Sequence, residues 1–178
     1  MLQTPVPSAE EARANTAFDA LLWALSRPGL SRMLPEQGEG AIISALLDRE
    51  CRVHSVDPLL IPDIMRTGAE VADIDVADHV FLGSSARSEV LDHVAIGSDL
   101  YPDDGATIIA RCRIGTGSAI RLTGPGVKGT LTLQIDGLPN GFWSTREARL
   151  RYPTGFDIFL VDGATVMGIP RSTTVEEL

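Results

Sequence analysis

The chain has 178 residues and a mass of 19.0 kDa, a length that suits one domain, and 44% of its residues are hydrophobic, enough to bury a core. Its formal net charge of -9 opposes a nucleic-acid partner, because binding to the phosphate backbone requires a basic face. No apolar stretch approaches the roughly 20 residues of a membrane span, and the first residues lack a signal pattern, so we expect a cytoplasmic protein with free thiols and no membrane partner.

The first predicted element is a helix that begins after Ser8. Ser8 and Glu11 form a capping-box pattern, in which each side chain accepts a hydrogen bond from a backbone N–H of the other. An apolar stripe at helical spacing follows, made of Ala14, Ala17, Phe18, Leu21, Leu22 and Leu25. The stripe predicts one buried face, and Pro28-Gly29 ends the helix.

Helical patterns dominate the first half of the chain and strand patterns the second. In the first half, helices are predicted over residues 41–47, 58–66 and 88–95, and strands over residues 52–56 and 79–82. In the second half, strands are predicted over residues 107–112, 119–123 and 130–135, a helix over 141–149, and a hairpin of 157–161 with 165–169. We therefore expect one domain over residues 1–178, built on a mixed sheet covered by helices, with a loose leader over 1–8 and a tail over 175–178.

A glycine-rich segment from Gly124 to Gly129 matches the pattern G-x-G-x-x-G. The dinucleotide fingerprint needs a helix that opens on its third glycine, but the residues that follow here read as a strand. The segment is therefore interpreted as a tight turn between strands. It also holds Lys128, the single lysine of the chain, so any Schiff-base chemistry would have to use a residue inside a turn.

Other candidate sites are weaker. Cys51 and His54 have the spacing of half a metal site, but structural zinc usually takes four ligands, and the remaining cysteine and histidines are scattered. The pairs Asp78-His79 and Asp92-His93 are interpreted as surface or capping groups, since adjacent residues of a strand point to opposite faces. No serine lies in a G-x-S-x-G elbow and neither cysteine has a nucleophile signature. The residues thus predict no metal site, no cofactor and no self-sufficient active site.

The segment Pro170-Arg171-Ser172-Thr173-Thr174 carries one guanidinium and three hydroxyl groups directly after the hairpin. These groups suit the oxygens of a phosphate or phosphonate, and backbone N–H groups of the Gly124-Pro125-Gly126 turn, with Arg27, are expected to complete the pocket. On this hypothesis Arg171→Ala weakens anion binding while the fold persists. The alternative, which composition favours, is a solvated tail that ties the terminus to the body.

Several segments together resemble the PhnH family of the bacterial carbon-phosphorus lyase system. The resemblance runs in family order from Phe18 to Thr174, and no single piece is diagnostic by itself. It is carried by Phe18-Asp19-Ala20-Leu21-Leu22, Ser26-Arg27-Pro28-Gly29, Ala45-Leu46-Leu47-Asp48, Ala77-Asp78, Gly105-Ala106-Thr107, Gly124-Pro125-Gly126 with Gly129, Gly137-Leu138-Pro139, Tyr152-Pro153-Thr154-Gly155-Phe156-Asp157 and Pro170-Arg171-Ser172-Thr173-Thr174. The family usually has Thr where Ser172 stands, and Ser keeps the hydroxyl group.

The resemblance implies a three-layer α/β/α sandwich related to the pyridoxal-phosphate-dependent transferases, without the cofactor lysine. It also implies a homodimer that joins the PhnG, PhnI and PhnJ subunits in a core complex. That complex forms a ribose 1-phosphonate 5-triphosphate from ATP and an alkylphosphonate, with the present chain in a supporting role. The competing hypothesis is a stand-alone phosphate-ester or nucleotide-binding enzyme.

Overall fold

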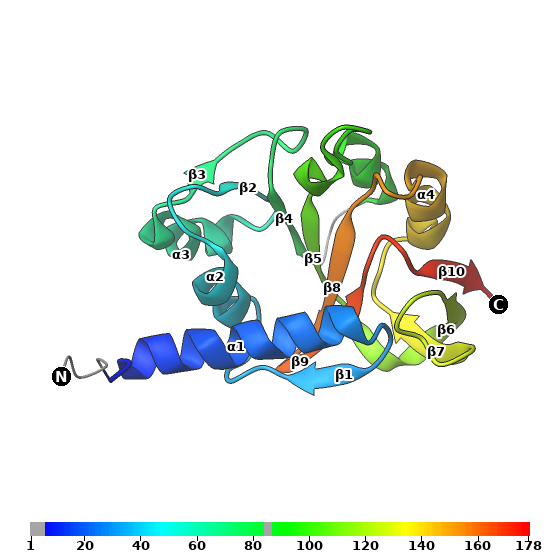
Figure 1. The fold of residues 1–178 in the computed structure, drawn as a ribbon, viewed down its shortest axis with the longest axis horizontal. Coiled ribbons are helices and arrows are strands. Elements are labelled where there is room, and N and C mark those ends of the chain that lie inside the picture. Colours follow the sequence, from blue (N-terminus) through cyan, green and yellow to red (C-terminus); the bar gives the residue numbers. More distant parts are fainter. Residues whose placement is uncertain (1–5, 84–86) are drawn as a thin grey trace.

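The computed structural model describes residues 6–83 and 87–178, and its centre is a seven-stranded mixed sheet (Figure 1). The strand order is β1-β9-β8-β5-β4-β2-β3. The five strands from β8 to β3 run parallel to one another. At the other side of the sheet, β9 pairs antiparallel with β8, and β1 pairs antiparallel with β9. The strands are β1 Ser31–Met33, β2 Arg52–Ser55, β3 Glu70–Val71, β4 His79–Gly83, β5 Thr107–Arg111, β8 Asp157–Asp162 and β9 Thr165–Ile169.

Helix α1 (Ala9–Ser26) crosses one face of this sheet. The predicted capping box is present: the Ser8 hydroxyl accepts from the Glu11 N–H, and the Glu11 carboxylate accepts from the Ser8 N–H. The helix buries Ala17, Ala20, Leu21 and Ala24. Three of these four residues are alanines, so the helix backbone can approach the sheet closely.

Two shorter helices share that face with α1. They are α2 (Gly40–Leu46) and α3 (Ile61–Thr67), the latter preceded by the 3-10 turn η1 (Pro58–Leu60). Their apolar residues form one cluster with the residues of β2, β4, β5, β8 and β9 that point to this side, such as Phe81 and Ile109. Gly68 ends α3 in the left-handed conformation that glycine adopts readily, as the sequence predicted.

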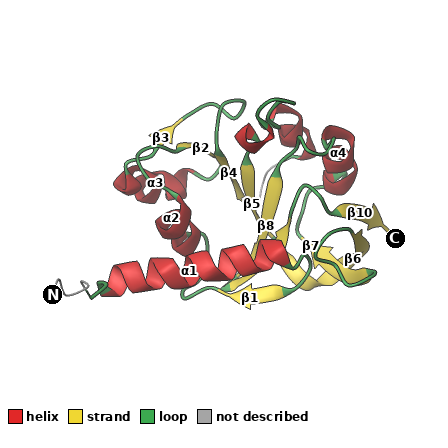
Figure 2. Ribbon diagram, in the orientation of Figure 1, coloured by secondary structure: helices red, strands yellow, loops and turns green. Residues whose placement is uncertain are grey.

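The opposite face is covered by one helix, a 3-10 segment and a second, smaller sheet (Figure 2). The helix is α4 (Phe142–Arg149), and the 3-10 segment that packs on this face is η2 (Ser88–His93). Another 3-10 segment, η3 (Pro102–Asp104), precedes β5 and has no buried residue. The small antiparallel sheet has the order β10-β6-β7, with β6 Arg113–Thr123, β7 Leu131–Asp136 and β10 Thr174–Glu177. Alternating residues of the central strands, such as Ile108 and Leu160, complete this second cluster.

The prediction of a mixed sheet covered by helices is confirmed, with differences of detail. Phe18 and Leu22 of the predicted buried stripe are at least half exposed, and β6 begins at Arg113, six residues before the predicted strand. Residues 88–93 form a 3-10 segment instead of a longer helix to Ala95. Most of the segment named as a C-terminal tail, 175–178, belongs to a strand, because Thr174–Glu177 pairs with β6 as β10. The strands β1 and β3 were missed, since they have three and two residues, all exposed, and no alternating apolar pattern. Residues 1–5 of the predicted leader lie outside the described residues.

None of the described helices is long and apolar enough to span a membrane.

Candidate functional site

The side chain of Arg171 is held by protein acceptors on three sides. Its Nη2 donates to Asp157 Oδ2 at 2.8 Å and its Nε lies 3.3 Å from Oδ1 of the same carboxylate. Its Nη1 donates to the carbonyl of Pro102, and its Nη2 also reaches the carbonyl of Gly105 at 3.4 Å. The backbone N–H of Arg171 donates to Asp157 Oδ1 at 2.8 Å. Arg171 therefore ties the end of β9 to the start of β8 and to η3.

The three hydroxyl residues after Arg171 lie in different environments. Thr173 is 2% exposed, and its Oγ1 is buried with no hydrogen-bond partner among the described residues. Ser172 is half-buried, and Thr174 is exposed at the start of β10. The Thr173 N–H donates to the carbonyl of Pro170, which makes the segment a tight turn. The hydroxyl groups consequently do not line one common surface.

The turn at Gly124-Pro125-Gly126 lies where the sequence placed it, next to both other parts of the expected pocket. A Cβ atom on Gly124 would lie 2.8 Å from the carbonyl oxygen of Ser172, and one on Gly126 would lie 2.6 Å from that of Ser26. Both glycines have positive φ angles. The turn backbone thus packs between the end of α1 and residues 172–173.

The two guanidinium groups of the expected pocket are engaged with different partners. That of Arg27 lies 5.0 Å from the centre of the Trp23 ring, on which Arg32 also stacks at 3.9 Å, whereas that of Arg171 binds Asp157. The structure therefore brings the backbones of the predicted segments together, with the charge of Arg171 balanced by a carboxylate. Anion binding at Arg27, Gly124, Pro125, Gly126 and residues 171–174 stays a prediction.

Lys128 is exposed in the turn between β6 and β7. A lysine that forms an aldimine with pyridoxal phosphate needs a neighbourhood that holds the cofactor and shields it from water, and an exposed turn offers neither. We expect no stoichiometric aldimine on incubation with pyridoxal phosphate. Borohydride reduction followed by peptide mass spectrometry measures this, with Lys128→Arg as the control for reaction at the chain's amino terminus. A one-to-one reduced adduct on Lys128 would contradict the expectation.

A cluster of three charged residues, which the sequence analysis did not identify, occupies the carboxyl edge of the parallel strands. Arg111 ends β5 and lies 2.6 Å from the Glu39 carboxylate through Nε and 2.8 Å from the Asp57 carboxylate through Nη1. Glu39 precedes α2 and is only 4% exposed, and Asp57 precedes η1. The cluster joins three segments at the edge where open α/β sheets commonly bind ligands.

The surroundings of Arg111 and Asp57 favour the charged form of each side chain. Burial lowers the pKa of Arg111, but its close contacts with the carboxylates of Glu39 and Asp57 outweigh this effect and raise the pKa. The hydrogen bond from the Leu59 N–H lowers the pKa of Asp57, and Arg111 acts in the same direction. A cleft of about 420 Å³ opens beside the cluster and reaches Gly38, Cys112 and Gly163. Of the three charged residues, Glu39 and Arg111 line this cleft, so its wall carries one carboxylate and one guanidinium.

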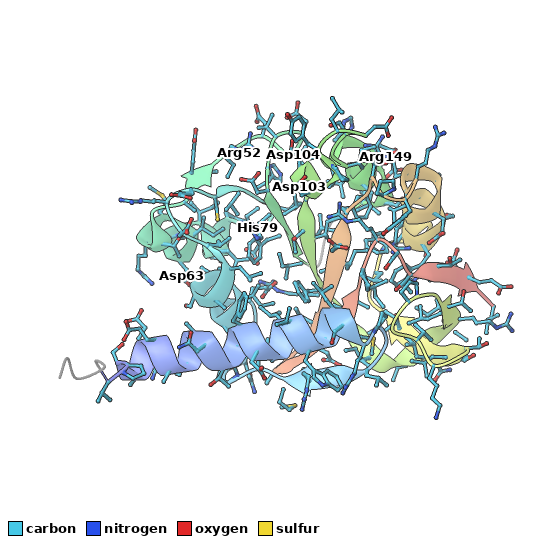
Figure 3. All side chains as sticks on the ribbon, in the orientation of Figure 1. Arg52, Asp63, His79, Asp103, Asp104 and Arg149 are labelled. Atoms are coloured by element: carbon cyan, nitrogen blue, oxygen red, sulfur yellow. The ribbon has the colours of Figure 1, made fainter. Side chains whose placement is uncertain are left out.

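The cysteines and histidines lie in separate environments. Burial raises the pKa of Cys112 to about 12, so its thiol stays protonated at neutral pH. Cys51 Sγ contacts the Asp48 carboxylate, while His54 Nδ1 lies 3.1 Å from the carbonyl of Ala72. The Asp78 carboxylate accepts from Arg52 at 2.8 Å, and burial lowers the pKa of the neighbouring His79 (Figure 3). Within the described residues, no group of three or more His, Cys, Asp or Glu is placed to hold a metal ion.

Comparison with known families gives one match that covers almost the whole chain. The profile of "Bacterial phosphonate metabolism protein (PhnH)" matches residues 8–176. The chain belongs to the PhnH family. The resemblance inferred from the sequence is thereby confirmed.

Two curated relatives of this PhnH-family chain match over most of their own length. A protein of Stutzerimonas stutzeri named "Putative C-P lyase subunit protein HtxG" is 34% identical over 171 residues, which cover 92% of this chain and 86% of the relative. A protein of Rhizobium meliloti (strain 1021) named "Alpha-D-ribose 1-methylphosphonate 5-triphosphate synthase subunit PhnH" is 27% identical over 183 residues, with 92% and 90% coverage. Both names describe subunits of a larger enzyme.

The PhnH-family match includes both the Arg171 segment and the Glu39–Arg111–Asp57 cluster. The Glu39–Arg111–Asp57 cluster was not predicted from the sequence, because its three residues are far apart in the chain. One local signal was present: Arg111 is a charged residue at the end of an otherwise apolar predicted strand. Such a residue lies at the carboxyl edge when the strand is parallel, and its partners depend on how the loops fold.

Proposed function

We propose that the chain is a supporting subunit of a carbon-phosphorus lyase assembly in organic phosphonate catabolism. In that role it is needed for the formation of α-D-ribose 1-alkylphosphonate 5-triphosphate from ATP and an alkylphosphonate. The observation that carries the proposal is that both relatives are named as subunits of this kind and match 92% of the chain. Coverage of this extent favours a common role for the whole chain over one for a shared fragment.

The chemistry of the described side chains favours a supporting role for the chain rather than independent catalysis. Arg171 and Arg111, the arginines best placed to hold an anion, are each paired with carboxylates. Cys112 stays protonated and Lys128 is exposed, so neither offers an activated nucleophile. A nucleophile that lacks both a lowered pKa and a neighbouring base is a poor catalyst.

The finer part of the proposal concerns fold, assembly and ligand. We place the chain with the pyridoxal-phosphate-dependent transferase fold, lacking the cofactor lysine, and in the cytoplasm. Its partners are a second copy in a homodimer and the PhnG, PhnI and PhnJ subunits. Phe18, Leu22 and Met33 support self-association, because all three are large apolar side chains at least half exposed. A phosphonate or phosphate remains the proposed small ligand of the segment at residues 171–174.

Co-purification tests the proposed function. A tagged chain expressed in its native host on a phosphonate as sole phosphorus source is expected to carry the other subunits of the assembly, identified by mass spectrometry, and its deletion is expected to abolish growth on phosphonate while growth on phosphate persists. Light scattering of the isolated chain is expected to give the mass of a dimer. Recovery of the chain alone, together with normal growth of the deletion strain, would point instead to a stand-alone enzyme acting on phosphate esters.

A further inference from the structure

The first half of α1 overhangs the rest of the molecule. Of residues 9–16, only Ala14 is even half-buried, and the first fully buried residue of the helix is Ala17. Figure 1 shows this part of α1 running out beside α2 and α3 toward the amino terminus. The capping box at Ser8 satisfies two backbone N–H groups at this end of the helix and so favours the helical conformation of the exposed first turns.

A cavity of about 540 Å³ lies between this overhanging helix and the helices α2 and α3. Its apolar floor comes from Ile43 and Leu47 of the α2 segment and from Ala14 of α1. The groove is wide enough for several side chains of another molecule, since small-ligand pockets begin at about 300 Å³. We call this cavity, with its walls, the α1–α3 groove.

The rim of the α1–α3 groove carries four carboxylates from three separate segments. Glu10 and Glu11 come from the first turn of α1 and Glu36 from the loop before α2. Asp63, which is labelled in Figure 3, comes from α3. Arg66 also lines the groove and is already paired with Asp63. A smaller adjoining cavity brings Arg13 beside Glu10 and Glu36, although Arg13 forms no ion pair among the described residues. Glu10 and Glu36 have no ion pair among the described residues.

Part of this acidity has a local explanation. Carboxylates in the first turn stabilise a helix by opposing its dipole, and Glu11 also serves the capping box, whose hydrogen bonds lower its pKa. Glu36 has neither role, since it lies in a loop and no hydrogen bond of its side chain is formed with the described residues. Helix stability therefore does not explain why Glu36 lies at the same groove as carboxylates of two helices.

We propose that the α1–α3 groove docks a segment bearing Lys or Arg side chains from another subunit of the assembly. Glu10 and Glu36 are the two rim carboxylates without an ion pair or hydrogen bond among the described residues, and their separation fits two cationic side chains of a partner. No group of three or more His, Cys, Asp or Glu within the described residues is placed to hold a metal ion. A second copy fits poorly, because this chain has a net charge of -9 and seven of its arginines are held in internal ion pairs. The inference rests on the proposed function for the identity of the partner.

Charge reversal on the rim tests whether the other subunits bind at the groove or elsewhere on the surface. The variant Glu10→Lys/Glu36→Lys changes two exposed carboxylates that have no ion-pair partner and spares the capping box. The matched control is Asp99→Lys/Glu177→Lys, which makes the same change in net charge at exposed positions on other elements. Ser44→Trp, at an exposed position that lines the groove on α2, fills the groove without changing charge. Binding of each variant to the co-expressed remaining subunits is measured by surface plasmon resonance at two salt concentrations.

We expect the rim variant to associate about tenfold more slowly than the wild type and to lose most of its salt dependence, since charges at an interface rim act mainly on the association rate. Ser44→Trp is expected to dissociate faster, and the control to stay within about twofold of wild type. Equal association rates for the rim variant and its control would overturn the proposal that the groove is the docking site, while leaving the proposed function intact. No binding of the wild type to the other subunits would overturn both. A change of oligomeric state in the rim variant with unchanged subunit binding would assign the groove to self-association and so overturn the proposal.

Discussion

Arg171→Ala is expected to lower the free energy of unfolding by about 3 kcal/mol, because it leaves the Asp157 carboxylate without its guanidinium in a largely buried position. The side chains of Arg171 and Asp157 are 16% and 22% exposed. The substitution also leaves the carbonyl groups of Pro102 and Gly105 without their donor. For a chain of this length the loss corresponds to a fall in Tm of roughly 6–12 °C, measured by thermal unfolding followed by circular dichroism.

Two variants separate this effect from the loss of any surface arginine. Arg151→Ala removes an exposed arginine that has no ion pair among the described residues, and we expect a change within about 0.5 kcal/mol. The double variant Arg171→Met/Asp157→Asn should be less destabilised than the sum of its single variants, because removing both charges leaves none of them unpaired. An Arg171→Ala protein with the wild-type Tm and weaker binding of phosphonate would instead support the anion-binding role predicted from the sequence.

Gly168→Ala is expected to destabilise the protein by about 3 kcal/mol through a collision between β9 and α1. A Cβ atom on Gly168 would lie 2.6 Å from both the Ala24 carbonyl carbon and the Leu25 nitrogen. These are backbone atoms of a helix, so no side-chain rotation relieves the contact and α1 must move away from the sheet. Urea unfolding measures the loss as a lower midpoint.

Gly40→Ala is the matched control for this collision. A Cβ atom on Gly40 meets no other atom within 4 Å, and the residue lies at the start of helix α2. Alanine is the better helix former, so the variant is expected to gain up to about 1 kcal/mol. Equal stability of Gly168→Ala and the wild type would mean that α1 is held less closely against β9 than the structure shows.

The elements with strong local signals were predicted well from the sequence. Ser8 and Glu11 marked the start of α1 because a capping box is a contact between residues three apart. Gly68 marked the end of α3, and Asp162 with Gly163 marked the hairpin of β8 and β9. The family resemblance was also readable from the sequence, because it depends on the order and spacing of short segments.

The candidate site was predicted only in part, for a reason visible at Arg171. Its position after a strand was correct, and the turn at Gly124 does lie against the following residues. Its partner was not predicted, because Asp157 begins a strand that pairs with β9, and only the register of that hairpin brings the two side chains together. Sequence patterns report which residues are charged, but they do not report which charge neutralises which.

By itself the sequence determined the kinds of element, their order along the chain and membership in the PhnH family. Tertiary structure alone decided that Thr174–Glu177 joins a sheet, that Glu39, Asp57 and Arg111 meet at the carboxyl edge, and that α1 overhangs an acidic groove. The physical reason is how far apart in the sequence the interacting residues lie. Helix caps and turns are satisfied by hydrogen bonds between neighbours in the chain, whereas edge strands, ion-pair clusters and grooves arise where segments far apart in the chain are packed against one another.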